Sequence, residues 1–166
     1  MEEKVFRNIS NMLEETIEAY EEMLDLYKEK KQALLKPDKE MLRFVDEKIL
    51  AHVNIIKQVN KKREDYCTEN DISPSKINNL IEVASKEYPE FEKIYQEQKV
   101  KINEVAKELA LVEKTNVELI KHGLIMSDKL LDIIISAAQP QTDNYDMYGK
   151  NADKSELSIS SIVEDA

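Results

Sequence analysis

The sequence predicts an all-α protein: an elongated antiparallel helical bundle or coiled coil of three long helices, one short crossing helix and a flexible C-terminal tail. The composition is 42% hydrophobic and 35% charged, with two glycines and no tryptophan, which is typical of long solvated helices that share a narrow core. Apolar residues recur at alternating spacings of three and four, the period of a helix that buries one stripe. The prolines stand between these periodic segments, because proline withholds an amide that a helix interior needs.

The first helix is predicted over residues 2–36. Its stripe keeps heptad spacing and is interrupted by two polar residues, Thr16 and Lys30. The members of the stripe are Phe6, Ile9, Leu13, Tyr20, Met23, Tyr27 and Leu34. Pro37 ends the helix, because the residue before a proline is pushed out of the α region.

The second helix is predicted over residues 39–67, with Asp38 as its N-cap. Its stripe consists of Leu42, Val45, Ile49, Ile56, Val59 and Tyr66. His52 and Arg63 occupy polar positions on the same stripe, and we interpret His52 as a partly exposed, hydrogen-bonded core residue. The short link after the first helix favours an antiparallel hairpin.

A short third helix is predicted over residues 74–85, with Ser73 as a cap and Pro74 at the first helical position. One face of it carries Ile77, Leu80, Ile81 and Ala84. A helix of this length is not stable alone. We therefore expect it to pack across one end of the bundle.

The fourth helix opens at Pro89 and is predicted to reach Ala138, on the order of 70 Å at 1.5 Å per residue. It is longer than the first two helices, so we expect it to overhang them. Its seam consists of Phe91, Ile94, Ile102, Val105, Leu109, Val112, Leu119, Met126, Leu130 and Ile133. Gln98, Asn116 and Gly123 are weak seam positions, and Gly123 is expected at a bend or a close approach.

Towards its end the fourth helix becomes apolar almost all round. Between Leu130 and Ala138 only Asp132 and Ser136 are polar. An ordinary bundle helix buries one stripe and exposes the rest to water. The surplus apolar surface makes this end of the helix a candidate binding surface.

Residues 1–138 are predicted to form the helical bundle domain and residues 139–166 a C-terminal tail. The tail is acidic and rich in turn residues, so it cannot bury enough surface to offset its ordering entropy when free. Leu157, Ile159, Ile162 and Val163 are spaced so that a helical turn or two could form against a partner. Tyr148, a tail aromatic, would suit a partner's pocket.

Several functional classes are disfavoured by composition. The net charge of −10 argues against binding nucleic acid. Neither His52 nor His122 has a glutamate three residues before it, as carboxylate metal sites in bundles require, and two glycines cannot build a phosphate loop. We therefore predict no enzyme, no metal and no cofactor.

A cytoplasmic location without membrane insertion is expected. The single cysteine, Cys67, forms no internal disulfide and suits a reducing compartment. The acidic N-terminus does not look like a signal peptide, and no apolar run is long enough to span a bilayer.

Several short segments resemble the FlgN family of cytosolic flagellar export chaperones. Residues 33–42 (ALLKPDKEML) are similar to that family's hinge between its first two helices, and the following helix, which closes on Lys61-Lys62-Arg63, is similar to its second. Residues 75–81 (SKINNLI) resemble its short crossing helix. The most specific likeness is Asn116-x-x-Leu119-Ile120-x-x-x-Leu124, followed later by Tyr148-Gly149. The second glycine that often follows this pair in the family is missing from Lys150-Asn151-Ala152.

The resemblance implies a chaperone that binds C-terminal helical segments of hook-associated (hook–filament junction) proteins, keeps them unassembled and presents them to the export gate. Tyr148 would by analogy contact the gate. From the apolar surplus and the tail, the predicted client-binding residues are Leu124, Met126, Leu130, Leu131, Ile134, Ile135, Leu157, Ile159 and Ile162. We expect a monomer or weak homodimer.

Two other readings remain open from the residues. A structural coiled-coil homodimer or adaptor with no secretion role would use the apolar helix end as its own interface. A peripheral membrane protein would need a basic polar face, whereas Asp128 and Asp132 border the apolar residues here.

Overall fold

The structure is a computed structural model that describes residues 2–36 and 38–138. Four helices make up nearly all of this part of the chain: α1 (Glu3–Leu35), α2 (Lys39–Glu69), α3 (Ile77–Glu87) and α4 (Pro89–Ala138). The described residues contain no strand, which confirms the predicted all-α class. The described residues divide into two units between Ile125 and Met126.

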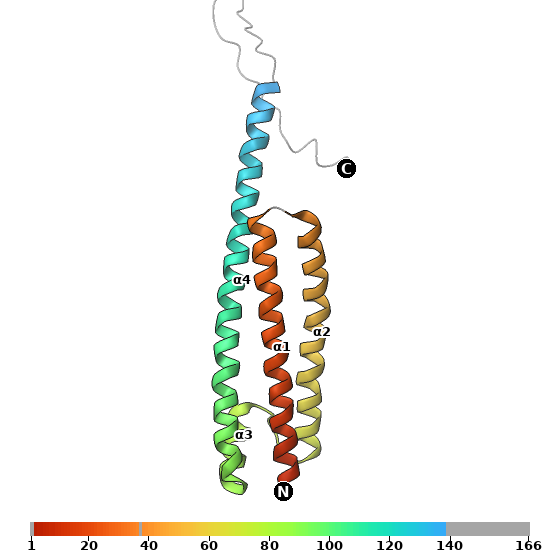
Figure 1. The fold of residues 1–166 in the computed structure, drawn as a ribbon, viewed down its shortest axis with the longest axis vertical. Helices are drawn as coiled ribbons and strands as arrows, with labels where there is room; N and C mark the ends of the chain where they lie inside the picture. The colour runs from red at the N-terminus through yellow and green to blue at the C-terminus, as the bar shows by residue number, and fades with distance from the viewer. Residues whose placement is uncertain (1, 37, 139–166) are drawn as a thin grey trace, which may run out of the picture. The chain divides into compact units, whose positions relative to one another are not determined.

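In the first unit, α1 and α2 form the predicted antiparallel hairpin (Figure 1). Early residues of α1 meet late residues of α2, and the reverse. The side-chain contacts that show this are Asn8 to Tyr66 (2.8 Å), Glu15 to Lys62 (2.8 Å) and Lys30 to Asp46 (2.7 Å). The predicted N-cap is confirmed, because Asp38 Oδ1 accepts the amide of Met41 at 2.9 Å.

Helix α4 runs parallel to α1 at a constant register. Tyr95 donates its hydroxyl hydrogen to the carbonyl of Phe6, 89 residues earlier, at 2.8 Å. The Asn116 side-chain amide donates to the carbonyl of Tyr27, again 89 residues earlier, at 3.0 Å. At this offset the last residue of α1, Leu35, is level with Leu124. The first unit therefore ends close to where α1 ends.

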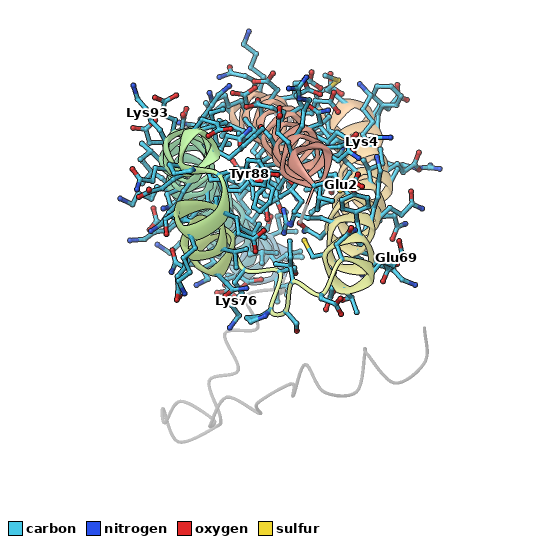
Figure 2. All side chains as sticks on the ribbon, turned by 90° about the horizontal axis from the view of Figure 1, so that it is seen from below. Glu2, Lys4, Glu69, Lys76, Tyr88 and Lys93 are labelled. Carbon is cyan, nitrogen blue, oxygen red and sulfur yellow. The ribbon has the colours of Figure 1, made fainter. Side chains whose placement is uncertain are left out.

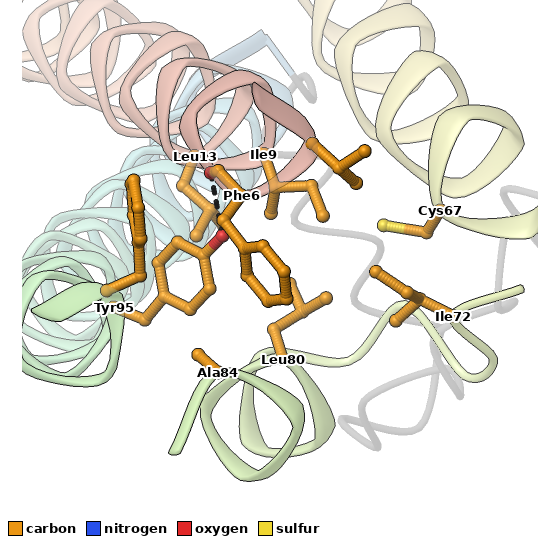
Figure 3. Close-up of a cluster of buried hydrophobic side chains, with 10 residues drawn as sticks. Phe6, Ile9, Leu13, Cys67, Ile72, Leu80, Ala84 and Tyr95 are labelled. Carbon is orange, nitrogen blue, oxygen red and sulfur yellow. Dashed lines mark hydrogen bonds between the residues drawn. The ribbon is translucent and has the colours of Figure 1, made fainter. Parts of the chain in front are cut away.

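Helix α3 closes one end of the first unit, as predicted. Tyr88 lies inside this end and its ring meets that of Phe6 at 4.9 Å, whereas Lys93, Lys76 and Glu69 stand around the outside (Figure 2). Leu80 and Ala84 are buried against the start of α1, the end of α2 and the start of α4 (Figure 3). The cluster of buried side chains consists of Val5, Phe6, Ile9, Leu13, Cys67, Ile72, Leu80, Ala84, Phe91 and Tyr95.

The predicted start of the third helix is wrong. The residues from Ser73 to Lys76 are not helical, and the peptide bond before Pro74 is cis. The first helical hydrogen bonds run from the amides of Asn79 and Leu80 to the carbonyl of Lys76 at 2.9 and 3.1 Å. Ser-Pro therefore belongs to the loop, and the helix begins at Ile77 with Lys76 as its N-cap.

Polar seam residues are buried more deeply than the sequence suggested. His52 is 5% exposed, and its Nε2 lies 2.7 Å from the carbonyl oxygen of Ala19. Gln98 and Asn116, predicted as weak positions, are buried and hydrogen-bonded to α1. Gly123 makes no close approach within the described residues, because a Cβ added there would have open space around it.

Candidate functional site

The second half of α4 changes from half-buried to fully exposed along the chain. Asn116 is its last buried residue, and every side chain from Ile120 to Ala138 is exposed. Large apolar side chains dominate the part that belongs to the second unit. They are Met126 (46% exposed), Leu130 (56%), Leu131 (55%), Ile133 (64%), Ile134 (61%) and Ile135 (44%). Six neighbouring side chains of this kind are more than the scattered apolar residues of an ordinary surface.

Helix geometry sorts these side chains into two parallel rows. Met126, Leu130, Ile133 and Ala137 repeat at spacings of four, three and four, and they continue the heptad seam that starts at Phe91. We call this row the continuing seam. Leu131, Ile134, Ile135 and Ala138 lie beside it, and we call them the second seam. Together the two seams cover roughly 200° around the helix axis, about twice the arc of a helix that packs with one stripe.

The charged residues of this segment lie on the remaining arc. Asp128 and Asp132 border the second seam, on the side of Ile135, and Lys129 borders the continuing seam, on the side of Ile133. Ser136 completes the polar arc, and Ser127 is the single polar residue within the apolar arc, where it lies between Ile134 and Ala138 of the second seam. The two edges of the apolar surface therefore differ in charge.

The predicted site residues fall into three groups. Met126, Leu130, Leu131, Ile134 and Ile135 are brought together on one helix with their side chains exposed. Leu124 is also exposed (62%) but belongs to the end of the first unit. Tyr148, Leu157, Ile159 and Ile162 lie outside the described residues, and the predicted boundary after Ala138 stays a prediction.

One residue outside the predicted client-binding set is equally exposed. Ile133 was assigned to the seam and not to the binding surface, yet it is the most exposed of the six at 64%. The signal was present in the sequence, since Ile133 stands in the same apolar run as Ile134 and Ile135.

The titratable groups with altered pKa values mostly belong to the bundle rather than to this surface. Burial raises the pKa of the Cys67 thiol and of the Tyr95 hydroxyl, and it lowers the pKa of the Arg63 guanidinium. Arg63 Nη1 donates to Thr16 Oγ1 at 2.9 Å, so these groups hold helices together. Nothing in their arrangement resembles a nucleophile with its base.

Other hollows in the first unit are open grooves between helices. The one between α1 and α2 has a volume of about 500 Å³ and is lined largely by long charged or polar side chains, including Gln58, Lys61, Lys62 and Glu69. A small-molecule site usually encloses most of its ligand, whereas these grooves are open to solvent, so they do not compete with the apolar end of α4. In the described chain, no three His, Cys, Asp or Glu side chains gather as metal ligands do.

Among the described helices, none combines the length and the apolar character that crossing a membrane requires.

The sequence model of a family described as FlgN protein matches residues 1–153, which is most of the chain and all of its described part. No curated protein and no solved structure matches.

Proposed function

The chain belongs to the FlgN family of flagellar export chaperones, and from that premise we propose that it binds the C-terminal helical segments of hook–filament junction proteins in the cytoplasm. It keeps these clients unassembled and delivers them to the flagellar export gate. The family is one of chaperones and not of enzymes, so the mechanism is masking and delivery without covalent chemistry.

The exposed apolar end of α4 is the observation that carries this proposal. A client segment that is amphipathic when helical has an apolar face that must be shielded until assembly. Helix-in-groove docking places such a face against apolar anchors at helical spacing. Leu131, Ile134 and Ile135 supply these anchors and Leu130 lies beside them, with 44–61% of each side chain free for contact.

The size of this surface suits a client that must later be released. Full burial of one such side chain stabilises by about 1.5–3 kcal/mol. Covering the exposed half of six is therefore worth on the order of 5–10 kcal/mol, against an association cost of about 4–15 kcal/mol. The difference between the free energy of burial and the cost of association favours weak to moderate affinity. This affinity is reached only when both seams are covered.

The predicted tail residues Leu157, Ile159 and Ile162 would add area to the complex. Part of the energy of that contact is spent on ordering the segment, so the tail strengthens binding without making it irreversible. Tyr148 is proposed as a contact for the export gate, on the family resemblance of the Tyr148-Gly149 pair.

The decisive experiment places a charge on the second seam. Ile134→Asp and Leu131→Asp are each expected to abolish binding of a peptide from the C-terminus of a junction protein of the same bacterium, because a buried unpaired carboxylate costs more than the contact provides. Isothermal titration calorimetry measures the binding. Far-ultraviolet circular dichroism should stay helical, since both side chains are already more than half exposed.

Ser136→Asp is the matched control, because it adds the same charge to the polar arc of the same turn. It should bind the peptide like the unaltered chain. Unchanged affinity in Ile134→Asp and Leu131→Asp would refute the proposed surface. Light scattering on the free chain tests the structural alternative: a dimer dissociated by Leu131→Asp, with no peptide binding, would favour a self-associating coiled coil.

A further inference from the structure

The width of the apolar surface on α4 is greater than one helix can cover. In a coiled coil, one neighbouring helix packs along one heptad seam. Between Met126 and Ala138 there are two, the continuing seam and the second seam, and both are exposed. A single client helix would leave one of them in water. The site that binds the client therefore has room for a second occupant.

The chain itself carries a suitable second occupant. In residues 157–163, Ile159, Ile162 and Val163 stand at i, i+3 and i+4, so on a helix they would share one face that fits one seam, whereas Leu157 would lie on the other side. The residues between Ala138 and Leu157 reach up to about 60 Å when extended, whereas Met126–Ala138 is about 20 Å long. A segment tethered this closely has an effective concentration in the millimolar range, so weak contacts suffice to hold it.

The charged residues beside the two seams determine which seam residues 157–163 prefer. Glu156 precedes it, and Glu164 and Asp165 follow it. The edge of the second seam carries Asp128 and Asp132, which repel these carboxylates, whereas the edge of the continuing seam carries Lys129. Charges at the rim of an interface mainly select register and partner, which is the selection needed here.

We infer that, in the client complex, residues 157–163 of this chain pack along the continuing seam beside Lys129, while the client helix packs along the second seam beside Asp128 and Asp132. This inference rests on the proposed function and adds two features to it. The client is held between α4 and the chain's own tail, and the client helix carries Lys or Arg at the edge that meets Asp128 and Asp132.

Double-mutant analysis of the full chain tests this arrangement, with the same junction-protein peptide as probe. The losses of binding free energy from two substitutions do not add when both act through one contact, whereas they add when the substitutions act at separate contacts. Ile133→Asp disrupts the continuing seam, Leu131→Asp disrupts the second seam, and the pair Ile159→Asp with Ile162→Asp disrupts the tail segment. Ser160→Asp is the control, because it places a similar charge between the apolar tail positions.

The expected result is a specific pattern of affinities. Ile133→Asp and the tail pair should each weaken peptide binding by about tenfold, and their combination should be no weaker than either one. Leu131→Ala, a milder change on the second seam, should weaken binding in the tail variant by the same factor as in the unaltered chain. Ser160→Asp should stay within about twofold of the unaltered chain.

Two outcomes would overturn the inference while leaving the proposed function intact. One is multiplication of the effects of Ile133→Asp and of the tail pair. The other is a tail variant that binds as tightly as the unaltered chain while Leu131→Asp still abolishes binding. If neither Ile133→Asp nor Leu131→Asp changes affinity, the proposed client surface itself is wrong, and this inference fails with it.

Discussion

Individual polar residues fix how the helices of the first unit align. Gln98 Nε2 donates to the carbonyl and the hydroxyl oxygen of Ser10, both at 3.0 Å, and Asn116 Nδ2 donates to the carbonyl of Tyr27. The amide oxygens Gln98 Oε1 and Asn116 Oδ1 are buried without a hydrogen-bond partner in the described structure. The net gain in stability is therefore small, and the main effect is on register, as with a single buried asparagine in a coiled coil.

The sequence located these polar positions but not their partners. Thr16, His52 and Arg63 were predicted as polar interruptions, and Gln98 and Asn116 as weak positions. A heptad pattern gives the face on which a residue lies, but it does not say which carbonyl of another helix comes within reach. That depends on the relative shift of two helices, which is set by packing over their whole length.

Tyr95 offers a pH-dependent test at this scale. Burial raises the pKa of its hydroxyl above the ordinary value of 10.0, and the hydroxyl donates to the carbonyl of Phe6. The folded chain thus keeps this proton at pH values where the unfolded chain loses it. Its contribution to the free energy of unfolding is complete below pH 10 and falls as the pH rises further.

Tyr95→Phe should therefore be less stable than the unaltered chain at pH 8 by about 1 kcal/mol, the value of one hydrogen bond. The difference should narrow as the pH rises beyond 10, because phenylalanine does not titrate. Urea unfolding at a series of pH values measures both effects. A difference that is constant with pH would show that Tyr95 does not titrate differently in the two states.

Among the elements, the long helices were predictable and the short one was not. The bounds of α1, α2 and α4 agree with the sequence within two residues, because many heptad positions and a proline or an N-cap mark each of them. Helix α3 has only three turns of pattern, and its start was misplaced at Pro74. Ser73-Pro74 correctly predicted an interruption between helices, but Ser73 is not the N-cap of α3.

Helix α3 matters because its apolar face covers one side of the buried cluster. Leu80 is 1% exposed, so Leu80→Ala should destabilise the bundle by about 2–5 kcal/mol through lost contacts and a cavity. Asn78→Ala on the exposed face of the same helix should change stability by less than about 0.5 kcal/mol. Chemical denaturation measures both, and equal stability of the two variants would contradict the packing role of α3.

For the whole molecule, stability and binding are predicted to reside in different parts of the chain. All buried residues of α4 lie at or before Asn116. A chain that ends at Ala138 should therefore keep its melting temperature within about 2 °C. It should nevertheless bind the junction-protein peptide more weakly, because the tail segment is missing.

Thermal unfolding followed by circular dichroism, together with calorimetric titration, tests both parts of this prediction. Loss of the cooperative transition in the shortened chain would show that residues after Ala138 are structural. The domain boundary predicted from the sequence would then be wrong.

The described half of the candidate site was predictable for a simple physical reason. Apolar residues at helical spacing identify a face, and a face wider than one stripe can be recognised before any partner is known. The division into two seams with edges of different charge also follows from the sequence once the helix is known to be continuous to Ala138. In residues 139–166 only a short stretch around Ile159, Ile162 and Val163 has helical spacing, so their sequence predicts a helical turn against a partner but not the surface that it contacts.

The amide contacts of Gln98 and Asn116 also have a consequence for length. If α4 slid along α1 by one heptad, the Gln98 amide would lose the Ser10 hydroxyl as an acceptor, although other backbone carbonyls of α1 would replace those of Ser10 and Tyr27. The same alignment places Leu124 of α4 level with Leu35, the last residue of α1. Two carboxamides far from the apolar end of α4 thus help to set the residue at which the packing of α4 against α1 stops.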